Sequence, residues 1–151
     1  MIALLFEKSK YAMMSFTLLR LLVDFGLVVL IWMVQLIIYP SFTAMTEESI
    51  KLWHPRYTGV ISLFVIPLMF GQVGLYAQAL LTECDWKTGL AALLIFVCWL
   101  STFVKAVPLH GQIDQLPSSL ADREELVLAN WPRTICWSLV FVRSLWEASS
   151  K

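Results

Sequence analysis

The chain has 151 residues, of which 59% are hydrophobic and 15% are charged, and its mean hydropathy is +0.74. A soluble domain is roughly 45 to 50% apolar, so this composition excludes a water-soluble globular protein. It also excludes a disordered chain. Eleven basic residues balance eleven acidic ones, which leaves no basic field for phosphates and argues against nucleic acid as a partner. The composition predicts an integral membrane protein in contact with lipids.

Four stretches of the chain are candidates for membrane-spanning helices. A bilayer core of about 30 Å requires roughly 20 apolar residues per helix. Charge-free runs cover residues 25–46, 57–82 and 88–104, and the lysines that flank the third can extend it by snorkelling. A fourth stretch, 126–142, is the weakest because it contains Pro132 and Arg133. We predict spans at about 20–40, 57–81, 86–107 and 130–147, which form one domain over residues 1–151.

The segments outside these spans have simple interpretations. Residues 12–22 are predicted to be a helical lead-in to the first span, because the apolar run is too long for a signal peptide and no cleavage site follows it. Ser119 is a candidate N-cap with Asp122 in the first turn. A short helix at the membrane surface is therefore expected before the last span. The fold class is an all-α bundle of four transmembrane helices.

The distribution of basic residues gives a weak prediction of orientation. Six lysines and arginines lie on the side of the termini and five on the other side. Because cytoplasmic loops are enriched in Lys and Arg, both termini are predicted to be cytoplasmic.

Polar residues are predicted to gather at the end of the bundle opposite the termini, where the first and third spans end and the second and fourth begin. We expect Gln35 and Tyr39 to share a helix face, with Pro40 ending that helix. The other candidates are His54 in the following loop, His110 at the close of the third span, Asn130 and Arg133 at the start of the fourth, and Gln72 deeper in the second. Both histidines of the chain should thus lie at one rim.

Each candidate residue also has a structural interpretation. Gln35 and Gln72 are suited to interhelical hydrogen bonds, and Arg133 to lipid phosphate or a loop acid. The two histidines could ligate haem iron or, with nearby acids such as Asp114, a divalent metal. Their spacing matches no metal-binding motif, so no metal site is predicted.

Several chemistries have no support in the sequence. There is no hydrolase motif and no glycine-rich phosphate loop. No charged residue falls at the centre of a predicted span, which argues against an ion pump. Cys84, Cys98 and Cys136 form no C-x-x-C pair and are interpreted as small hydrophobic residues.

The polar motifs resemble those of a largely uncharacterised family of small bacterial four-helix integral membrane proteins. The shared patterns are Q-L-x-x-Y-P-x-F, V-P-x-H and N-W-x-R-T with a following W-x-x-R. The matching residues are Gln35, Tyr39, Pro40 and Phe42; His54 and Tyr57; Pro67, Met69 and Gln72; Trp99, Ser101, Thr102, Val107, Pro108 and His110; and Asn130, Trp131, Arg133, Thr134, Trp137 and Arg143. The resemblance implies a location in the bacterial inner membrane.

The chain departs from this family pattern at three positions. It has Ile38 and Tyr57 where the family has histidines, and Gln72 where the family has an acid. If the family site binds a metal or transfers protons, this member has kept His54 and His110 without their supporting ligands.

Two functions are compatible with the sequence. The favoured hypothesis is an accessory or structural subunit that packs against a larger membrane complex or against further copies of itself. The alternative is a small membrane enzyme or cofactor-binding protein with a polar pocket at one face, which would hold haem, a metal, a quinone or an aromatic substrate. Its pocket would be lined by Gln35, Tyr39, His54, His110, Asn130 and Arg133, with Gln72 below them.

Overall fold

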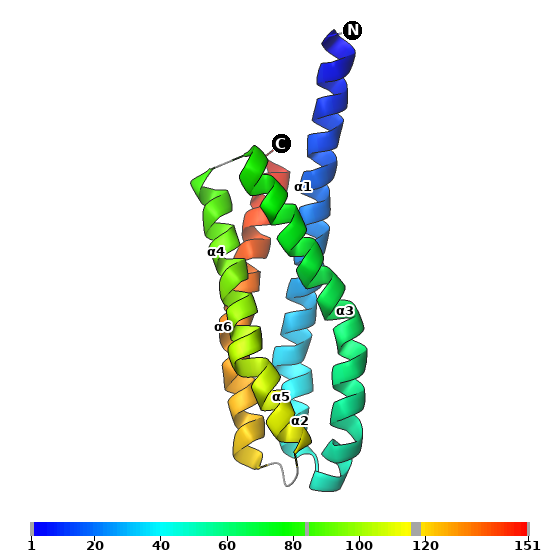
Figure 1. The fold of residues 1–151 in the computed structure, drawn as a ribbon, viewed down its shortest axis with the longest axis vertical. Coiled ribbons are helices and arrows are strands. Elements are labelled where there is room, and N and C mark those ends of the chain that lie inside the picture. The colour runs from blue at the N-terminus through cyan, green and yellow to red at the C-terminus, as the bar shows by residue number, and fades with distance from the viewer. Residues whose placement is uncertain (1, 84, 116–118, 151) are drawn as a thin grey trace.

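The computed structural model describes residues 2–83, 85–115 and 119–150, with residues 2–6 and 8–13 described by their backbone alone, and this part of the chain is a helical bundle (Figure 1). The first rod consists of α1 (Ile2–Met33), the π-helical η1 (Val34–Ile38) and α2 (Tyr39–Ala44), and the second is α3 (Glu47–Thr82). The third consists of α4 (Trp86–Ser101), the π-helical η2 (Thr102–Ala106) and α5 (Val107–Asp114), and the fourth is α6 (Leu120–Ser149). The described residues contain no strand, so the all-α prediction is confirmed.

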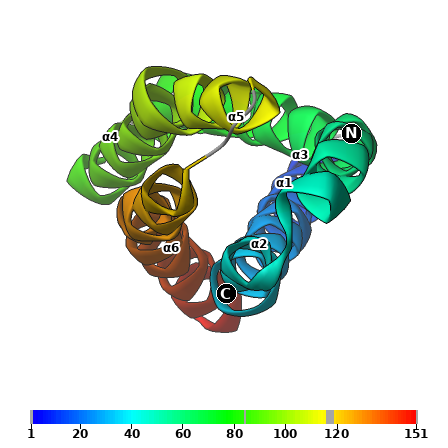
Figure 2. The ribbon, with the colours of Figure 1, turned by 90° about the horizontal axis from the view of Figure 1, so that it is seen from below.

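Successive rods run antiparallel and surround a shared interior (Figures 1 and 2). The α6 helix packs along both α1 and α4, while α3 contacts α1 on one side and α4 and α5 on the other. At the lower end of Figure 1, α2 and α5 end and α3 and α6 begin; at the upper end, α3 and α6 end and α4 begins.

Three side chains cap the helices that begin after loops. Thr46, Asp85 and Ser119 accept hydrogen bonds from backbone N–H groups at the starts of α3, α4 and α6, which satisfies donors that have no partner within the helix. Asp85 lies outside the apolar segments, and its hydrogen bonds from Thr88 lower its pKa. Ser119 also forms a reciprocal capping box with Asp122, so its prediction as an N-cap is confirmed.

The predicted short surface helix before the last span does not exist as a separate element. The helix that Ser119 caps is α6 itself, which continues for 30 residues. Arg123, Leu126, Asn130 and Thr134 are all buried, and their helical spacing places them on one face. The first turns of α6 therefore pack into the bundle and do not turn away along a membrane surface.

The prediction that Pro40 ends the first span is wrong, because the chain stays helical to Ala44. A proline ring clashes with the carbonyl four residues earlier in an α-helix. Here the preceding Tyr39 N–H donates to Val34 O, one residue further back than in an α-helix, and the wider turn accommodates the ring. The same arrangement recurs before Pro108, where the Val107 N–H donates to Thr102 O. Such π-helical turns are frequent at functional sites.

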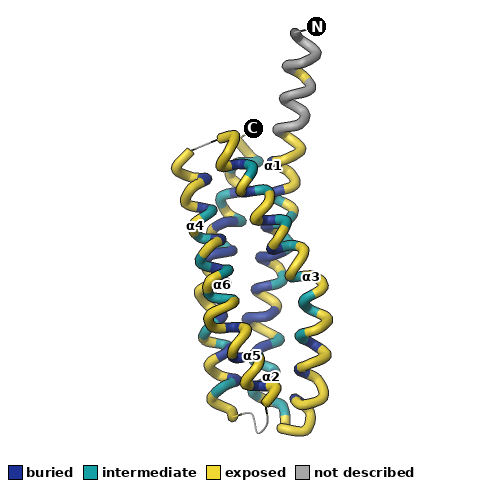
Figure 3. Tube along the Cα trace, in the orientation of Figure 1, coloured by how far each residue is buried: buried dark blue, intermediate teal, exposed yellow. Residues whose placement is uncertain are grey.

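In the part of the chain that the structure describes, three helical segments are long and apolar enough to cross a membrane: Met14–Ala44, Glu47–Thr82 and Trp86–Asp114. The α6 helix, which we predicted as the fourth span, is not among them. Large apolar side chains cover the outer faces of the helices, and the buried residues face inward (Figure 3). Each helix extends beyond the span predicted for it, and residues 12–22 belong to α1.

The interior of the bundle holds charged side chains. Arg20, Asp24 and Arg133 are 3%, 1% and 6% exposed, and each lies close to the start of its predicted span and not at the centre. Asp24 belongs to the first predicted span, 20–40, with apolar residues on both sides. Cys98 and Cys136 are buried free thiols; Cys84 lies outside the described residues.

Candidate functional site

Both histidines lie in helices at the lower end of the bundle and contact each other. His54 is fully buried in the second turn of α3, so its predicted position in a loop is wrong; the Thr46 cap starts the helix earlier. His54 Nε2 and His110 Nδ1 are 2.8 Å apart. The prediction that the two imidazoles meet at one end is confirmed.

The histidine pair connects the surface to the interior. On the surface side, His54 Nδ1 lies 2.6 Å from Oδ1 of Asp114, whose side chain is 40% exposed at the end of α5. On the interior side, His110 Nε2 lies 2.9 Å from the hydroxyl of Tyr39, which is 4% exposed. A chain of three hydrogen bonds thus links a surface carboxylate to a buried phenol.

The chain continues from Tyr39 into a buried polar cluster on α6 and η1. Arg133 Nη2 donates to the Tyr39 hydroxyl at 3.4 Å and to Asn130 Oδ1 at 2.5 Å. Asn130 Nδ2 donates to Gln35 Oε1 at 2.9 Å, and Gln35 Nε2 donates to the carbonyl of Val127 at 3.2 Å. Six of the seven residues predicted for the site therefore belong to one hydrogen-bonded network. The η1 turn places Gln35 and Tyr39 on the same side of the first rod.

One assignment of protons satisfies every link of this network. With Asp114 ionised and both imidazoles neutral, His54 Nδ1–H donates to Asp114 and His110 Nδ1–H donates to His54 Nε2. The Tyr39 hydroxyl then donates to His110 Nε2 and accepts from Arg133. All the donors point the same way, from the guanidinium toward the surface carboxylate.

Arg133 differs from most buried cations because its partners are all neutral. It donates to Asn130, Tyr39 and Thr102, and among the described residues no carboxylate forms an ion pair with it. Its Nε is buried without any hydrogen-bond partner in this part of the chain. A buried side chain cannot reach lipid phosphate at the interface, so that interpretation of Arg133 is wrong.

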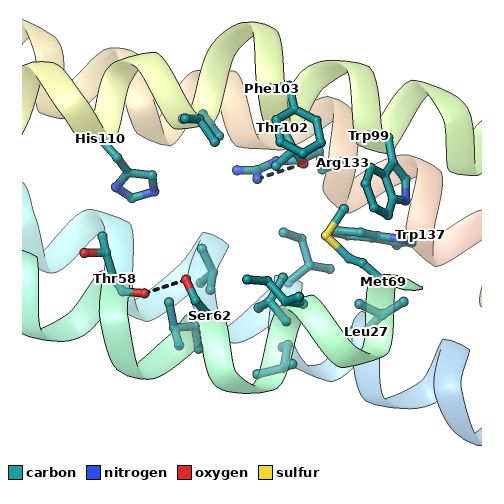
Figure 4. A pocket seen from close by; sticks show the side chains of 18 of the residues that line it. Leu27, Thr58, Ser62, Met69, Trp99, Thr102, Phe103, His110, Arg133 and Trp137 are labelled. Carbon is teal, nitrogen blue, oxygen red and sulfur yellow. Dashed lines mark hydrogen bonds between the residues drawn. The ribbon is translucent and has the colours of Figure 1, made fainter. Parts of the chain in front are cut away.

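A cavity of about 360 Å³ adjoins this network and is lined by α3, by the first rod and by α4, η2, α5 and α6 (Figure 4). Its polar residues include Arg133, Tyr39, His110, Thr102, Thr58 and Ser62. Most of the wall is apolar, and its aromatic residues are Tyr57, Phe70, Trp99, Phe103 and Trp137. The cavity has the size and the mixture of apolar walls and few polar groups that are typical of small-molecule sites.

The cavity opens to the outer surface of the bundle between α3 and the third rod. Ile66, Phe70, Phe103 and Val107 line it and are each more than half exposed. Since these residues belong to segments apolar enough to cross a membrane, the opening is surrounded by apolar surface. A molecule dissolved in lipid would reach the polar end from there.

Gln72 is the one predicted site residue that lies outside the histidine network. It does hydrogen-bond across the bundle as predicted: Nε2 donates to Asp24 at 2.6 Å and Oε1 accepts from Trp137 at 3.0 Å. The hydroxyls of Tyr76 and Ser144 also donate to Asp24. Gln72 is therefore part of a second polar cluster, nearer the upper end.

The donor set does not fit a haem or metal site. All four ring nitrogens of His54 and His110 have a partner in the network, so ligation would break at least one of these hydrogen bonds. Within the described ranges, no group of three or more His, Cys, Asp or Glu side chains is placed to hold a metal ion.

Comparisons with protein-family models, with curated proteins and with solved structures found no match to this chain. The family resemblance described above therefore stays a prediction, and the assignment of function rests on the geometry of the site.

Proposed function

We propose that this protein crosses the membrane four times and binds a lipid-soluble aromatic compound with an ionisable hydroxyl group, a phenol or a quinol. The compound occupies the cavity beside α3, with its oxygen at Arg133. The observation that carries the proposal is the buried guanidinium of Arg133, which lines a cavity and lacks a carboxylate partner.

An anionic oxygen is the partner that this guanidinium lacks. Arginine stays protonated in proteins, and a buried charge without a counter-charge costs several kcal/mol. A phenolate oxygen would supply the counter-charge and accept a charge-assisted hydrogen bond, which is shorter and stronger than a neutral one. Trp99 contributes a second unpartnered donor on the cavity wall, because its buried indole Nε1 has no partner among the described residues.

The rest of the cavity favours an aromatic body. Aromatic side chains pack edge-on or offset against other rings and gain about 0.5 to 1.5 kcal/mol per pair beyond area burial. Phe70 and Trp99 already pair in this way at the cavity wall, with ring centroids 5.1 Å apart and planes at 84°. A flat ring would fit beside them.

The accessory role that the composition favours explains less of the structure. Its main support is the apolar outer surface, which lipid alone would cover in a membrane protein. A partner complex would not account for a buried, unpaired arginine beside a cavity. The proposed setting is otherwise the one predicted from the sequence, the bacterial inner membrane with both termini in the cytoplasm.

Binding can be tested with an alkylated nitrophenol, which is coloured only as its anion. We expect the purified protein in detergent to bind it saturably, with the anion absorbance rising at a pH where the free probe is mostly neutral. Arg133→Met should weaken binding about 10- to 100-fold, since a hydrogen bond to a charged group contributes about 1.5 to 3 kcal/mol.

Arg123→Met is the matched control. Arg123 is also buried on α6, but it donates to the carbonyl of Met45 and pairs with Glu47 and does not line the cavity. Its replacement should leave probe affinity unchanged. Equal loss in both variants, or co-purification of the wild type in a large assembly without probe binding, would support the accessory role instead.

A further inference from the structure

The proposed function raises the question of where the hydroxyl proton of the ligand goes. A phenol reaches the cavity through lipid in its neutral form, whereas Arg133 favours the anion. Bulk water would normally accept the released proton, but an apolar cavity does not provide it. Building on the proposed function, we infer that Tyr39, His110, His54 and Asp114 form a proton relay that carries this proton from the cavity to the surface.

The relay has the geometry that proton transfer needs. Its three links measure 2.9 Å from Tyr39 to His110, 2.8 Å from His110 to His54 and 2.6 Å from His54 to Asp114. Each lies in the range of a direct hydrogen bond, and within reach for general acid–base transfer. One end lines the cavity and the other is a partly exposed carboxylate.

One proton moves at each link of the relay. The ligand O–H passes its proton to the Tyr39 oxygen, while Tyr39 passes its own to His110 Nε2. His110 passes the Nδ1 proton to His54 Nε2, and His54 passes the Nδ1 proton to Asp114. The ligand becomes an anion held by Arg133, the two imidazoles and the phenol stay neutral, and Asp114 carries the proton until it ionises to water.

The surrounding residues keep the relay fixed in position. The ring of Phe42 contacts His54 edge-on, with centroids 5.3 Å apart, and lies 5.9 Å from Tyr39. Phe42 and Ile50 are fully buried in the same apolar core cluster. Because side chains in a packed core sit in fixed rotamers, the imidazoles are preorganised for transfer.

The relay predicts a kinetic effect that a structural role would not produce. In Asp114→Asn the amide oxygen can still accept from His54 Nδ1–H, but the side chain cannot take up a proton. After rapid mixing with the alkylated nitrophenol, we expect the bound anion colour to appear about 100-fold more slowly than in the wild type. Tyr39→Phe should have a similar effect, and Asp114→Glu should restore most of the rate.

The methyl ether of the same probe is the control ligand, because it occupies the cavity without ionising. Its affinity should be equal in the wild type and in Asp114→Asn, because Asp114 does not line the cavity, and equal affinities show that the cavity is intact. The wild-type rate should also fall in deuterium oxide. If the wild type binds the coloured anion and both variants form it at the wild-type rate, the relay is wrong and the binding proposal stands. If the wild type does not bind the probe at all, both proposals are overturned.

Discussion

Arg20 and Arg133 are buried arginines in opposite situations. Arg20, near the upper end, donates to Glu83 at 2.8 Å and to Glu147 at 2.6 Å. Arg133, beside the cavity, donates only to neutral groups. Their exposed fractions are almost the same, 3% and 6%, so the difference lies in charge compensation alone.

This contrast extends to the polar clusters that surround the two arginines. At the upper end, Asp24 accepts from Gln72, Tyr76 and Ser144, and its carboxylate oxygens are satisfied within the protein. At the lower end, the cluster leaves Arg133 Nε without a partner and borders a cavity. Buried polar groups that are fully satisfied hold helices together, whereas an incomplete set has capacity for a ligand.

The largest loss of stability is expected from Arg20→Met. The substitution leaves Glu83 without its cation and Glu147 with Arg143 alone, and removing one partner of a buried ion pair costs about 3 to 5 kcal/mol. We expect the free energy of unfolding, measured by tryptophan fluorescence as denaturing detergent is added to a mild one, to fall by that amount. A loss below about 1 kcal/mol would show that water already solvates these acids, as at a surface ion pair.

A smaller loss is expected from Asp24→Leu, about 2 kcal/mol in the same measurement. The substitution leaves the Gln72 amide as a buried donor without an acceptor, which costs about 1 to 3 kcal/mol, whereas the Tyr76 hydroxyl can still bond to Ser144. Removal of the buried carboxylate itself offsets part of this cost. Asp24→Asn retains one acceptor oxygen and should lose less; the opposite order of the two variants would contradict the assigned hydrogen bonds.

Much of the fold could be predicted because bilayer thickness and apolar runs set the helices. The ends of the helices could not be predicted, because they depend on capping side chains and on buried residues within more polar stretches of the sequence. Predicted to start at residue 57, the second helix starts at Glu47, since Thr46 caps it and Ile50 and His54 are buried. The π turns before Pro40 and Pro108 are backbone adjustments that no residue pattern marked in advance.

Most of the candidate site could be predicted from the number of membrane-spanning helices. An even number of helices brings His54 and His110 to one end, and helical spacing places Asn130 near Arg133. Asp24 was not among the predicted site residues, although an acid flanked by apolar residues on both sides indicates an intramembrane group. The direct links between side chains depend on rotamers, which a single sequence does not specify.

The smallest effect on stability is expected from Arg133→Met. Methionine is similar in length and leaves no carboxylate unpaired, because the partners of Arg133 are neutral. The lost hydrogen bond to Asn130 costs about 1 kcal/mol, and the relief of an uncompensated buried charge acts in the other direction. We expect the free energy of unfolding without ligand to change by less than about 1 kcal/mol or to rise, while nitrophenol binding weakens about 10- to 100-fold. Natural sites commonly trade stability for function in this way. A loss comparable to that of Arg20→Met would mean that Arg133 is structural, and Arg133 and Arg20 would then have the same role.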